Sequence, residues 1–246
     1  MWTKEQIIYH KKAAENLIKI KNLTFQHIKR NPNISEFEIQ QFILKNFKDY
    51  GMVTEEDPPI VAFDEDSATP EFYPKKESKR LKPDTFILID LWAKLDKENA
   101  PFADITWVAY YGKNIPDEIQ DVFDLIVKAR ENTLNFISNF LKNKNYPPIG
   151  KDANNACTEI ISDAGYEKNI LHSTGHSLGI YKDHGPEQNC LEKTATGELS
   201  KNLGYTIEPG IYLPGKFGIR SEIDFYISED NEVIATTEMQ KEIVKL

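Results

Sequence analysis

Apolar residues recur every three to four positions through the first fifty residues, as they do along one face of a helix. Thr3 and Gln6 form a capping-box pattern ahead of the first run, which predicts a helix over residues 4–29. A similar pair of a serine and a glutamate precedes the next run. The spacing therefore predicts a second helix over residues 36–50, with Gly51 as its C-terminal cap.

Two later runs are rich in β-branched and aromatic residues instead. They are TFILIDLWAKL at residues 85–95 and ADITWVAYY at residues 103–111, and a short polar segment joins them. This arrangement predicts a β-hairpin, and an apolar patch at residues 60–63 predicts a further strand. Each arm of the hairpin contains one aspartate, Asp90 in the first and Asp104 in the second.

Helical spacing returns over residues 116–144. Asp152 is expected to cap a shorter helix that ends near Gly165. From Ile170 onward, short β-like runs alternate with turns that are rich in glycine and proline. No repeat, low-complexity tract or flexible linker separates these segments, so their order predicts one α+β domain.

The composition is that of an ordinary globular chain, with 246 residues of which 40% are hydrophobic and 28% charged. The net charge of -9 and the lack of long basic runs argue against a nucleic-acid partner. No apolar run approaches the roughly 18 residues of a membrane span, and charges interrupt the N-terminal segment where a signal peptide would be apolar. Cys157 and Cys190 form no disulfide framework and are interpreted as buried thiols, which favours a cytoplasmic location.

Two glutamates stand in apolar, strand-like sequence where a carboxylate is costly. Glu208 and Glu222 flank a turn rich in proline and glycine within GYTIEPGIYLPGKFGIRSEID. An ionised carboxylate in a low-dielectric interior needs a cation, a hydrogen bond or a metal. Asp90 and Asp104 pose the same problem, because paired antiparallel strands can bring such side chains within about 5 Å of each other.

His176, within STGHSLG, adds an imidazole to these four carboxylates. Such an oxygen-rich set suits two divalent ions such as manganese, iron, cobalt or zinc. Two metals about 3.5–4 Å apart can ionise a water, polarise a carbonyl and stabilise a tetrahedral intermediate. Taken singly, each residue also has an ordinary interpretation. An aspartate at the end of a strand is commonly part of a turn or a solvated edge, and a lone histidine is commonly structural.

The order and local contexts of these residues resemble the pita-bread metallopeptidases, the superfamily of methionine aminopeptidase, prolidase, aminopeptidase P and creatinase. The matching motifs run from Leu81 to Ser228 and include LKPDTFILIDLWAK, FADITW, HSTGHSLG, TIEPGIY and GIRSEID. The resemblance implies the pita-bread fold, a curved antiparallel sheet with helices packed on its outer face. Prolidase and aminopeptidase P carry a separate N-terminal domain, whereas this chain begins almost directly at the catalytic-type domain, so residues 1–246 are expected to form a single catalytic domain.

The resemblance also assigns a metal-binding role to each of the five residues. It implies that Asp90 chelates one metal, that Asp104 and Glu222 bridge both, and that His176 and Glu208 complete the other. Glu208 would also be the proton shuttle. It would take a proton from the metal-bound water, which leaves a bridging hydroxide, and deliver that proton to the leaving amine. The nucleophile would be that hydroxide.

Four further residues concern the substrate and the support of the ligands. Arg220 would orient carboxylates by charge-assisted hydrogen bonds. His172 resembles a histidine of the prolidase and aminopeptidase P members, and His184 one that contacts substrate and steadies the oxyanion; both are assigned to catalysis and substrate binding. Glu71, in SATPEFYP, stands where the family carries a histidine and would attract a free amino terminus.

These features predict a dinuclear metal-dependent exopeptidase that hydrolyses the N-terminal peptide bond of short peptides, of the Xaa-Pro type. The expected cofactor is two divalent ions, manganese, cobalt, zinc or iron, and the expected state is a monomer or homodimer with no membrane or nucleic-acid partner. Two alternatives stay open. One is a catalytically inactive pita-bread module that binds a peptide or protein, and the other is a creatinase-like C–N hydrolase.

Overall fold

The computed structural model describes residues 1–54, 57–186 and 190–246. Both expected capping boxes are present at the first two helices, where the side chains of Thr3 and Ser35 accept hydrogen bonds from the third helical N–H. Four long helices form, close to the expected positions. They are α1 (Lys4–Arg30), α2 (Glu36–Asp49), α3 (Asp117–Lys144) and α4 (Gly150–Asp163), with short 3-10 turns η1 (Asp64–Ala68) and η2 (Glu167–Asn169).

In the described ranges the strands form three sheets. A five-stranded sheet contains β1, β3, β4 and β10 in that order, with β2 also paired to β3; β5, β8 and β9 form a second sheet, and β6 and β7 a third. Pairing is antiparallel throughout except between β10 and β4. The strands are β1 (Met52–Val53), β2 (Ile60–Phe63), β3 (Thr85–Leu95), β4 (Ala103–Tyr111), β5 (Gly204–Ile207), β6 (Gly210–Leu213), β7 (Phe217–Arg220), β8 (Ile223–Ile227), β9 (Val233–Ala235) and β10 (Val244–Lys245).

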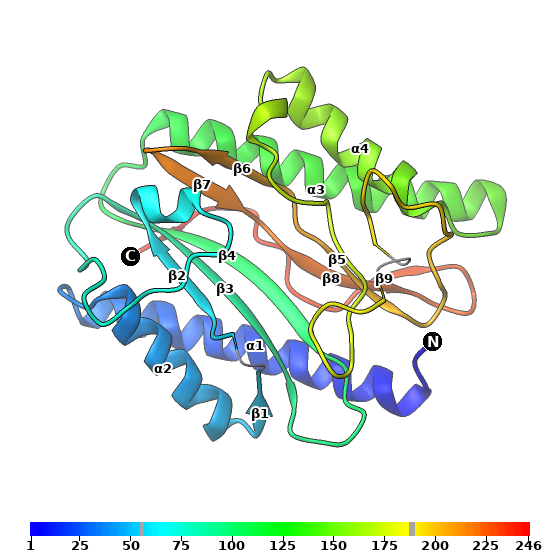
Figure 1. Ribbon diagram of the computed structural model, residues 1–246, viewed down its shortest axis with the longest axis horizontal. Helices are drawn as coiled ribbons and strands as arrows, with labels where there is room; N and C mark the ends of the chain where they lie inside the picture. The colour runs from blue at the N-terminus through cyan, green and yellow to red at the C-terminus, as the bar shows by residue number, and fades with distance from the viewer. Residues whose placement is uncertain (55–56, 187–189) are drawn as a thin grey trace.

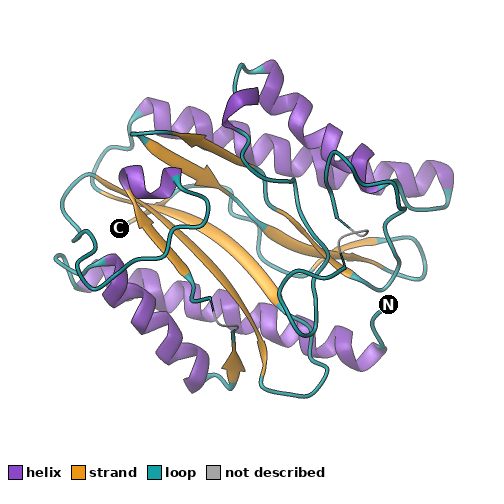
Figure 2. Ribbon diagram, viewed as in Figure 1, coloured by secondary structure: helices purple, strands orange, loops and turns teal. Residues whose placement is uncertain are grey.

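The helices lie on two sides of the strands. In Figure 1, α1 and α2 run along one side of the β3–β4 hairpin, and α3 and α4 run along the other side, beyond β6 and β7. Figure 2 shows the strands as a band between these two helical layers. Buried side chains of α1, α2, β3 and β4 form one core cluster, while others from β3 and β4 join α3, β6 and β7 in a second.

Alternation along β3 and β4 decides which side chains face which layer. Odd-numbered residues such as Ile89 and Ile105 pack against α1 and α2. Even-numbered ones such as Leu88 and Val108 belong to the cluster that contains α3. Because side chains alternate between the two faces of a strand, Asp90 lies on the second face, between the two halves of the molecule.

The second half brings the two glutamates together. Strand β5 pairs with β8, with Ile207 opposite Ile223, and β6 and β7 form a hairpin between them in sequence. Glu208 directly follows β5 and Glu222 directly precedes β8. Both therefore lie at strand ends, whereas the sequence had suggested positions inside strands. The register makes the two residues neighbours.

Two local expectations were wrong. Helix α4 begins at Gly150 with Ile149 at the N-cap, so Asp152 lies in its first turn and does not cap it. Cys190 is only partly buried, whereas Cys157 is buried as expected. None of the helices in the described ranges is both long enough and apolar enough to cross a bilayer.

Candidate metal centre

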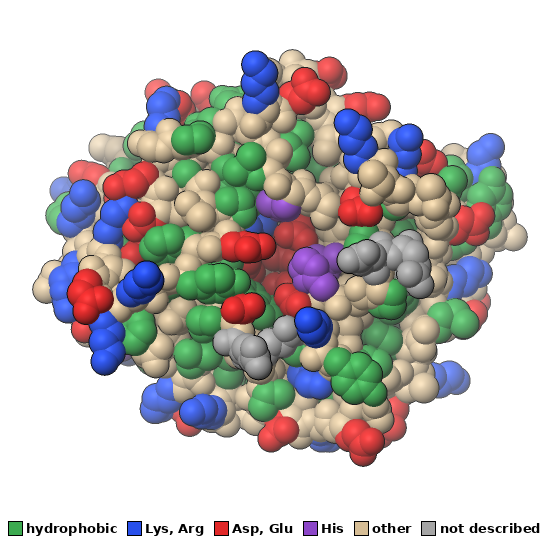
Figure 3. Space-filling model, viewed as in Figure 1, with side chains coloured by type: hydrophobic (Ala, Val, Ile, Leu, Met, Phe, Trp, Pro, Cys, Tyr) green, Lys and Arg blue, Asp and Glu red, His purple; other side chains and the backbone are tan. Residues whose placement is uncertain are grey.

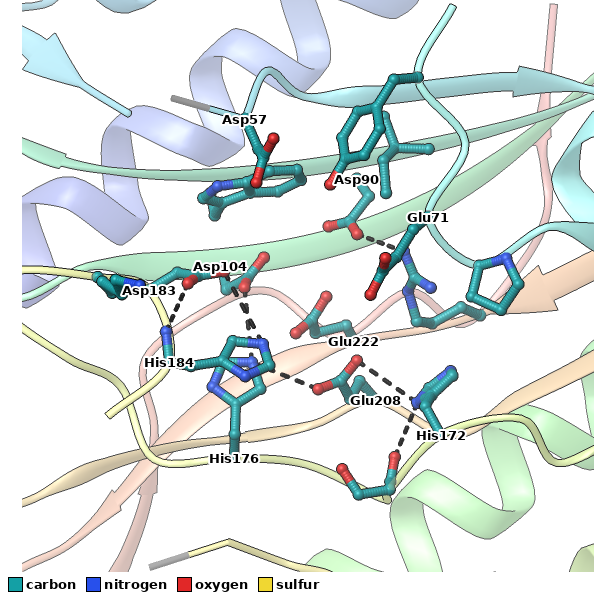
Figure 4. A pocket seen from close by; sticks show the side chains of 17 residues that line it. Asp57, Glu71, Asp90, Asp104, His172, His176, Asp183, His184, Glu208 and Glu222 are labelled. Carbon is teal, nitrogen blue, oxygen red and sulfur yellow. Dashed lines mark hydrogen bonds and ion pairs between the residues drawn. The ribbon is translucent and has the colours of Figure 1, made fainter. Parts of the chain in front are cut away.

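A pocket of about 400 Å³ opens between the β3–β4 hairpin and the second half of the molecule. Figure 3 shows it as a hollow lined by acidic side chains and histidine. The close-up in Figure 4 shows the carboxylates of the hairpin side facing the histidines on the opposite wall. All five predicted metal ligands line this pocket, namely Asp90, Asp104, His176, Glu208 and Glu222.

Three of these residues converge closely. One ligand atom each from Asp104, His176 and Glu222 lies within 4.8 Å of the others, and all three residues are buried. Glu208 is also near, because its Oε1 atom lies 3.4 Å from Nε2 of His176. Asp90 sits one step further along the hairpin, since it pairs with Thr106 and is a diagonal rather than a direct neighbour of Asp104.

The imidazole of His176 is held in the orientation that a metal ligand needs. Its Nδ1 atom lies 3.0 Å from the carbonyl oxygen of Ser177, so Nδ1 carries the proton and donates it. The lone pair of Nε2 is then directed toward Asp104 Oδ2, 3.9 Å away. Histidines that bind metals commonly have their second nitrogen fixed in this manner.

A close backbone contact fixes this loop. The N–H of His176 donates to the hydroxyl of Thr206 at 3.0 Å, and the N–H of Thr206 donates to the His176 carbonyl at 2.9 Å. At Gly175, an added Cβ atom would lie 2.2 Å from the carbonyl oxygen of Thr206. The glycine of STGHSLG is therefore required for the approach that carries His176 to β5.

Buried oxygen atoms of the aspartates have unused hydrogen-bonding capacity. Among the described residues, Asp90 Oδ1 and Asp104 Oδ1 are buried and have no hydrogen-bond partner. A buried, unpaired carboxylate oxygen costs free energy unless a cation or proton compensates. Four carboxylates and one properly oriented imidazole with free ligand atoms fit two hard divalent ions.

The guanidinium of Arg220 links two of the carboxylates. Its Nη2 donates to Oδ2 of Asp90, and its Nε donates to the hydroxyl of Thr106 at 2.9 Å. That hydroxyl donates in turn to Oε2 of Glu222 at 2.7 Å. Arg220 thus orients one carboxylate directly and another through Thr106.

The crowding of carboxylates shifts their protonation. Burial raises the pKa of Asp104 well above its ordinary value, and the negative charge of Glu222 adds to the effect. Burial and the charge of Glu208 do the same for the pKa of Glu222. Burial also lowers the pKa of His176, which keeps the imidazole neutral. Without a metal, the pocket therefore favours bound protons, and a dication would displace them.

His172 lines the pocket, but both of its ring nitrogens are engaged. Nδ1 lies 2.8 Å from the Ser173 carbonyl oxygen and donates to it. Nε2 lies 2.7 Å from the hydroxyl of Tyr212, which also accepts a hydrogen bond from Arg220. The Tyr212 hydroxyl therefore donates to His172, and burial raises the pKa of that hydroxyl to about 12.

His184 and Glu71 approach the pocket from opposite walls. The ring of His184 stacks on that of His176 with centroids 3.7 Å apart, and 66% of its side chain is exposed. Glu71 is exposed and projects into the pocket from the hairpin side (Figure 4). The charge around the mouth also includes Asp57, Lys182 and Asp183.

Sequence reasoning missed Thr106, which connects Arg220 to Glu222, and Tyr212, which connects Arg220 to His172. Thr106 follows Asp104 by two residues on the same strand, so strand alternation places both side chains on one face. That periodicity was a usable signal for Thr106. Tyr212 reaches the site through the β6–β7 hairpin, and no local pattern in the sequence marks its hydroxyl as part of the network.

Comparison with known proteins agrees with this geometry. The model of metallopeptidase family M24 matches residues 9–229, and the chain belongs to this family. An X-Pro aminopeptidase from Thermotoga maritima has a TM-score of 0.86 and 28% identity, over 100% of this chain and 64% of its own. A prolidase from Thermococcus sibiricus has a TM-score of 0.85 and 27% identity, over 100% of this chain and 62% of its own. The expected pita-bread fold is confirmed.

Two of the curated relatives that this chain matches are described as uncharacterized peptidases. One from Staphylococcus saprophyticus is 29% identical over 89% of this chain and 58% of its own length. Another from Schizosaccharomyces pombe is 30% identical over 83% of this chain and 43% of its own length. Since the chain spans only part of these relatives, a single domain over residues 1–246 stays a prediction.

Proposed function

We propose that the chain is a dinuclear metal-dependent exopeptidase that removes the N-terminal residue from short peptides. The observation that carries this proposal is the convergence of Asp104, His176 and Glu222 within 4.8 Å, with Glu208 beside them. Two divalent ions held there would supply an ionised water and a polarised scissile carbonyl. Asp90, Asp104, His176, Glu208 and Glu222 would hold them.

Glu208 would move the proton. Its Oε1 atom accepts a hydrogen bond from the Thr206 hydroxyl at 3.1 Å, and its Oε2 atom lies 3.9 Å from Nδ1 of His172. A carboxylate positioned in this manner can take a proton from the attacking water and return it to the departing amine. The Thr206 contact would keep the carboxylate directed into the pocket during both transfers.

Preference for Xaa-Pro peptides is the finer part of the proposal. It is supported by the likeness to an X-Pro aminopeptidase and to a prolidase, both above 25% identity. His172 and His184 would contact the substrate, and Glu71 would meet its free amino group. A cytoplasmic location is proposed with it, and the chain would act as a monomer or homodimer.

The test combines metal content with a peptide panel. The purified chain should bind two equivalents of manganese or cobalt and should hydrolyse Xaa-Pro peptides faster than matched Met-Xaa peptides. N-acetylation of the peptide should abolish turnover. Glu208→Ala should reduce kcat by at least about a hundredfold, as loss of a general base does, while the exposed Glu159→Gln variant should behave as wild type.

Three results would contradict the proposal. Turnover that survives Glu208→Ala would refute the assigned proton transfer. Stoichiometric metal binding without hydrolysis of any peptide would favour a peptide-binding module instead, and turnover of a non-peptide C–N substrate alone would favour a creatinase-like reaction.

A further inference from the structure

Asp224 is a fully buried carboxylate that the proposed reaction does not use. It lies on β8 two residues after Glu222, and none of its surface is exposed. Its Oδ2 atom accepts a hydrogen bond from the backbone N–H of Asp104 at 2.9 Å. These two residues are 120 positions apart in the sequence, so the contact exists only in the folded chain.

This hydrogen bond belongs to a seam that joins two sheets. On one side, the N–H of β4 at Asp104 donates to the Asp224 side chain. On the other, the N–H of Glu222 donates to the carbonyl oxygen of Thr106 at 3.3 Å. The seam thus connects the backbone of Asp104, one proposed bridging ligand, to β8, the strand that directly follows Glu222, the other.

Asp224 is itself anchored on both sides. Its N–H donates to the hydroxyl of Thr237 at 2.8 Å, and its carbonyl oxygen accepts from the N–H of Thr236 at 2.8 Å. With its backbone held, the carboxylate is a fixed acceptor for Asp104. A buried acceptor of this kind controls where the Asp104 Cα lies, and hence where its carboxylate points.

We infer that Asp224 is a positioning residue for the proposed metal centre, which sets the distance between the Asp104 and Glu222 ligands by holding the Asp104 N–H. This inference rests on the proposed metal site. It predicts that removal of the Asp224 acceptor lowers metal affinity by more than the loss of folding stability would cause by itself. Losses of supporting residues of this type cost about 10–100-fold in metal affinity.

The chain offers a matched control, a second buried side chain that accepts from an amide of β4. Gln240 is also buried, and its Oε1 atom accepts from the backbone N–H of Val108 at 2.9 Å. Asp224→Ala and Gln240→Ala therefore each remove one buried side-chain acceptor from a β4 amide. Only Asp224→Ala removes it next to a proposed ligand. Asp224→Asn keeps an oxygen acceptor of the same size for Asp104.

The first measurement is calorimetric titration of manganese or cobalt into the metal-free full chain. Asp224→Ala should weaken metal affinity at least tenfold relative to wild type, Gln240→Ala should leave it within about twofold, and Asp224→Asn should restore most of it. Equal metal affinity in Asp224→Ala and Gln240→Ala would overturn the inference, and so would an Asp224→Asn variant as weak as Asp224→Ala.

The second measurement needs no metal and separates this inference from the proposed function. Amide hydrogen exchange in the metal-free chain should be slow at Asp104 and should accelerate more than tenfold in Asp224→Ala but not in Gln240→Ala, where the amide of Val108 should accelerate instead. Unchanged exchange at Asp104 would overturn the inference. If exchange at Asp104 depends on Asp224 as expected but the wild-type chain binds no metal, the proposed metal site is refuted while the contact stands.

Discussion

Asp104→Asn should stabilise the metal-free chain while weakening its binding of metal. In the metal-free pocket, ligand oxygens of Asp104 and Glu222 lie within 4.8 Å of each other. At an effective dielectric constant of about 20, two unit charges at that distance repel by about 3.5 kcal/mol. Burial raises the pKa of both carboxyls, and the charge of Glu222 raises that of Asp104 further, so the folded chain relieves this repulsion by retaining protons.

The sign of the pH dependence follows from these raised pKa values. Below about pH 4 the carboxyls are protonated in both the folded and unfolded chains, so Asp104 costs little. As pH rises, the unfolded chain releases these protons first, and the free energy of unfolding falls. At pH 8 the uncharged asparagine side chain of the Asp104→Asn variant should therefore make the free energy of unfolding larger by about 1–3 kcal/mol, within the repulsion estimated from Coulomb's law.

Urea unfolding in EDTA, followed by tryptophan fluorescence at pH 5 and pH 8, measures this difference. The gain in Asp104→Asn should be larger at pH 8 than at pH 5, and at pH 8 it should raise Tm by several degrees, at about 2–4 °C per kcal/mol for a chain of this size. With saturating manganese the order should reverse, because the variant lacks a proposed bridging carboxylate. A variant less stable than wild type in EDTA at pH 8 would refute the charge-repulsion argument.

Three further outcomes follow from the same geometry. Gly175→Ala should lower the free energy of unfolding by about 1–3 kcal/mol, measured by urea titration, because its Cβ would lie 2.2 Å from the Thr206 carbonyl oxygen; an unchanged midpoint would contradict the close approach. Arg220→Met should cost about 3–5 kcal/mol by the same titration, because it leaves the buried Asp90 without its cation; a variant as stable as wild type would contradict a stabilising buried ion pair. Manganese at 100 times its Kd should add about 2.7 kcal/mol to the free energy of unfolding per site. Binding should be weaker at pH 5 than at pH 8, because protons compete for the carboxyls. Thermal unfolding with and without manganese at both pH values measures the difference, and equal stabilisation at pH 5 and pH 8 would contradict proton competition.

Local sequence determined much of the scaffold. The capping boxes at Thr3 and Ser35 began helices within a residue of their expected starts, because a cap involves only neighbours in sequence. The β3–β4 hairpin also matched its expected bounds, since β-branched runs on both sides of a polar turn pair locally. By contrast, Asp152 was expected to cap α4, but the helix starts earlier, where packing of Gly150 against the Cys190 carbonyl leaves no room for a Cβ.

The candidate ligands were identified from sequence, whereas their support came only from the tertiary structure. Asp90 and Asp104 could be recognised because strand periodicity and the surrounding motif mark them. The Thr106 contact with Glu222 spans 116 positions and the Arg220 contact with Asp90 spans 130. Hydrogen bonds across such distances depend on how the two halves pack, and no local pattern reports that packing. The sequence therefore marked the candidate ligands, and the fold decided which neutral and charged partners hold them together.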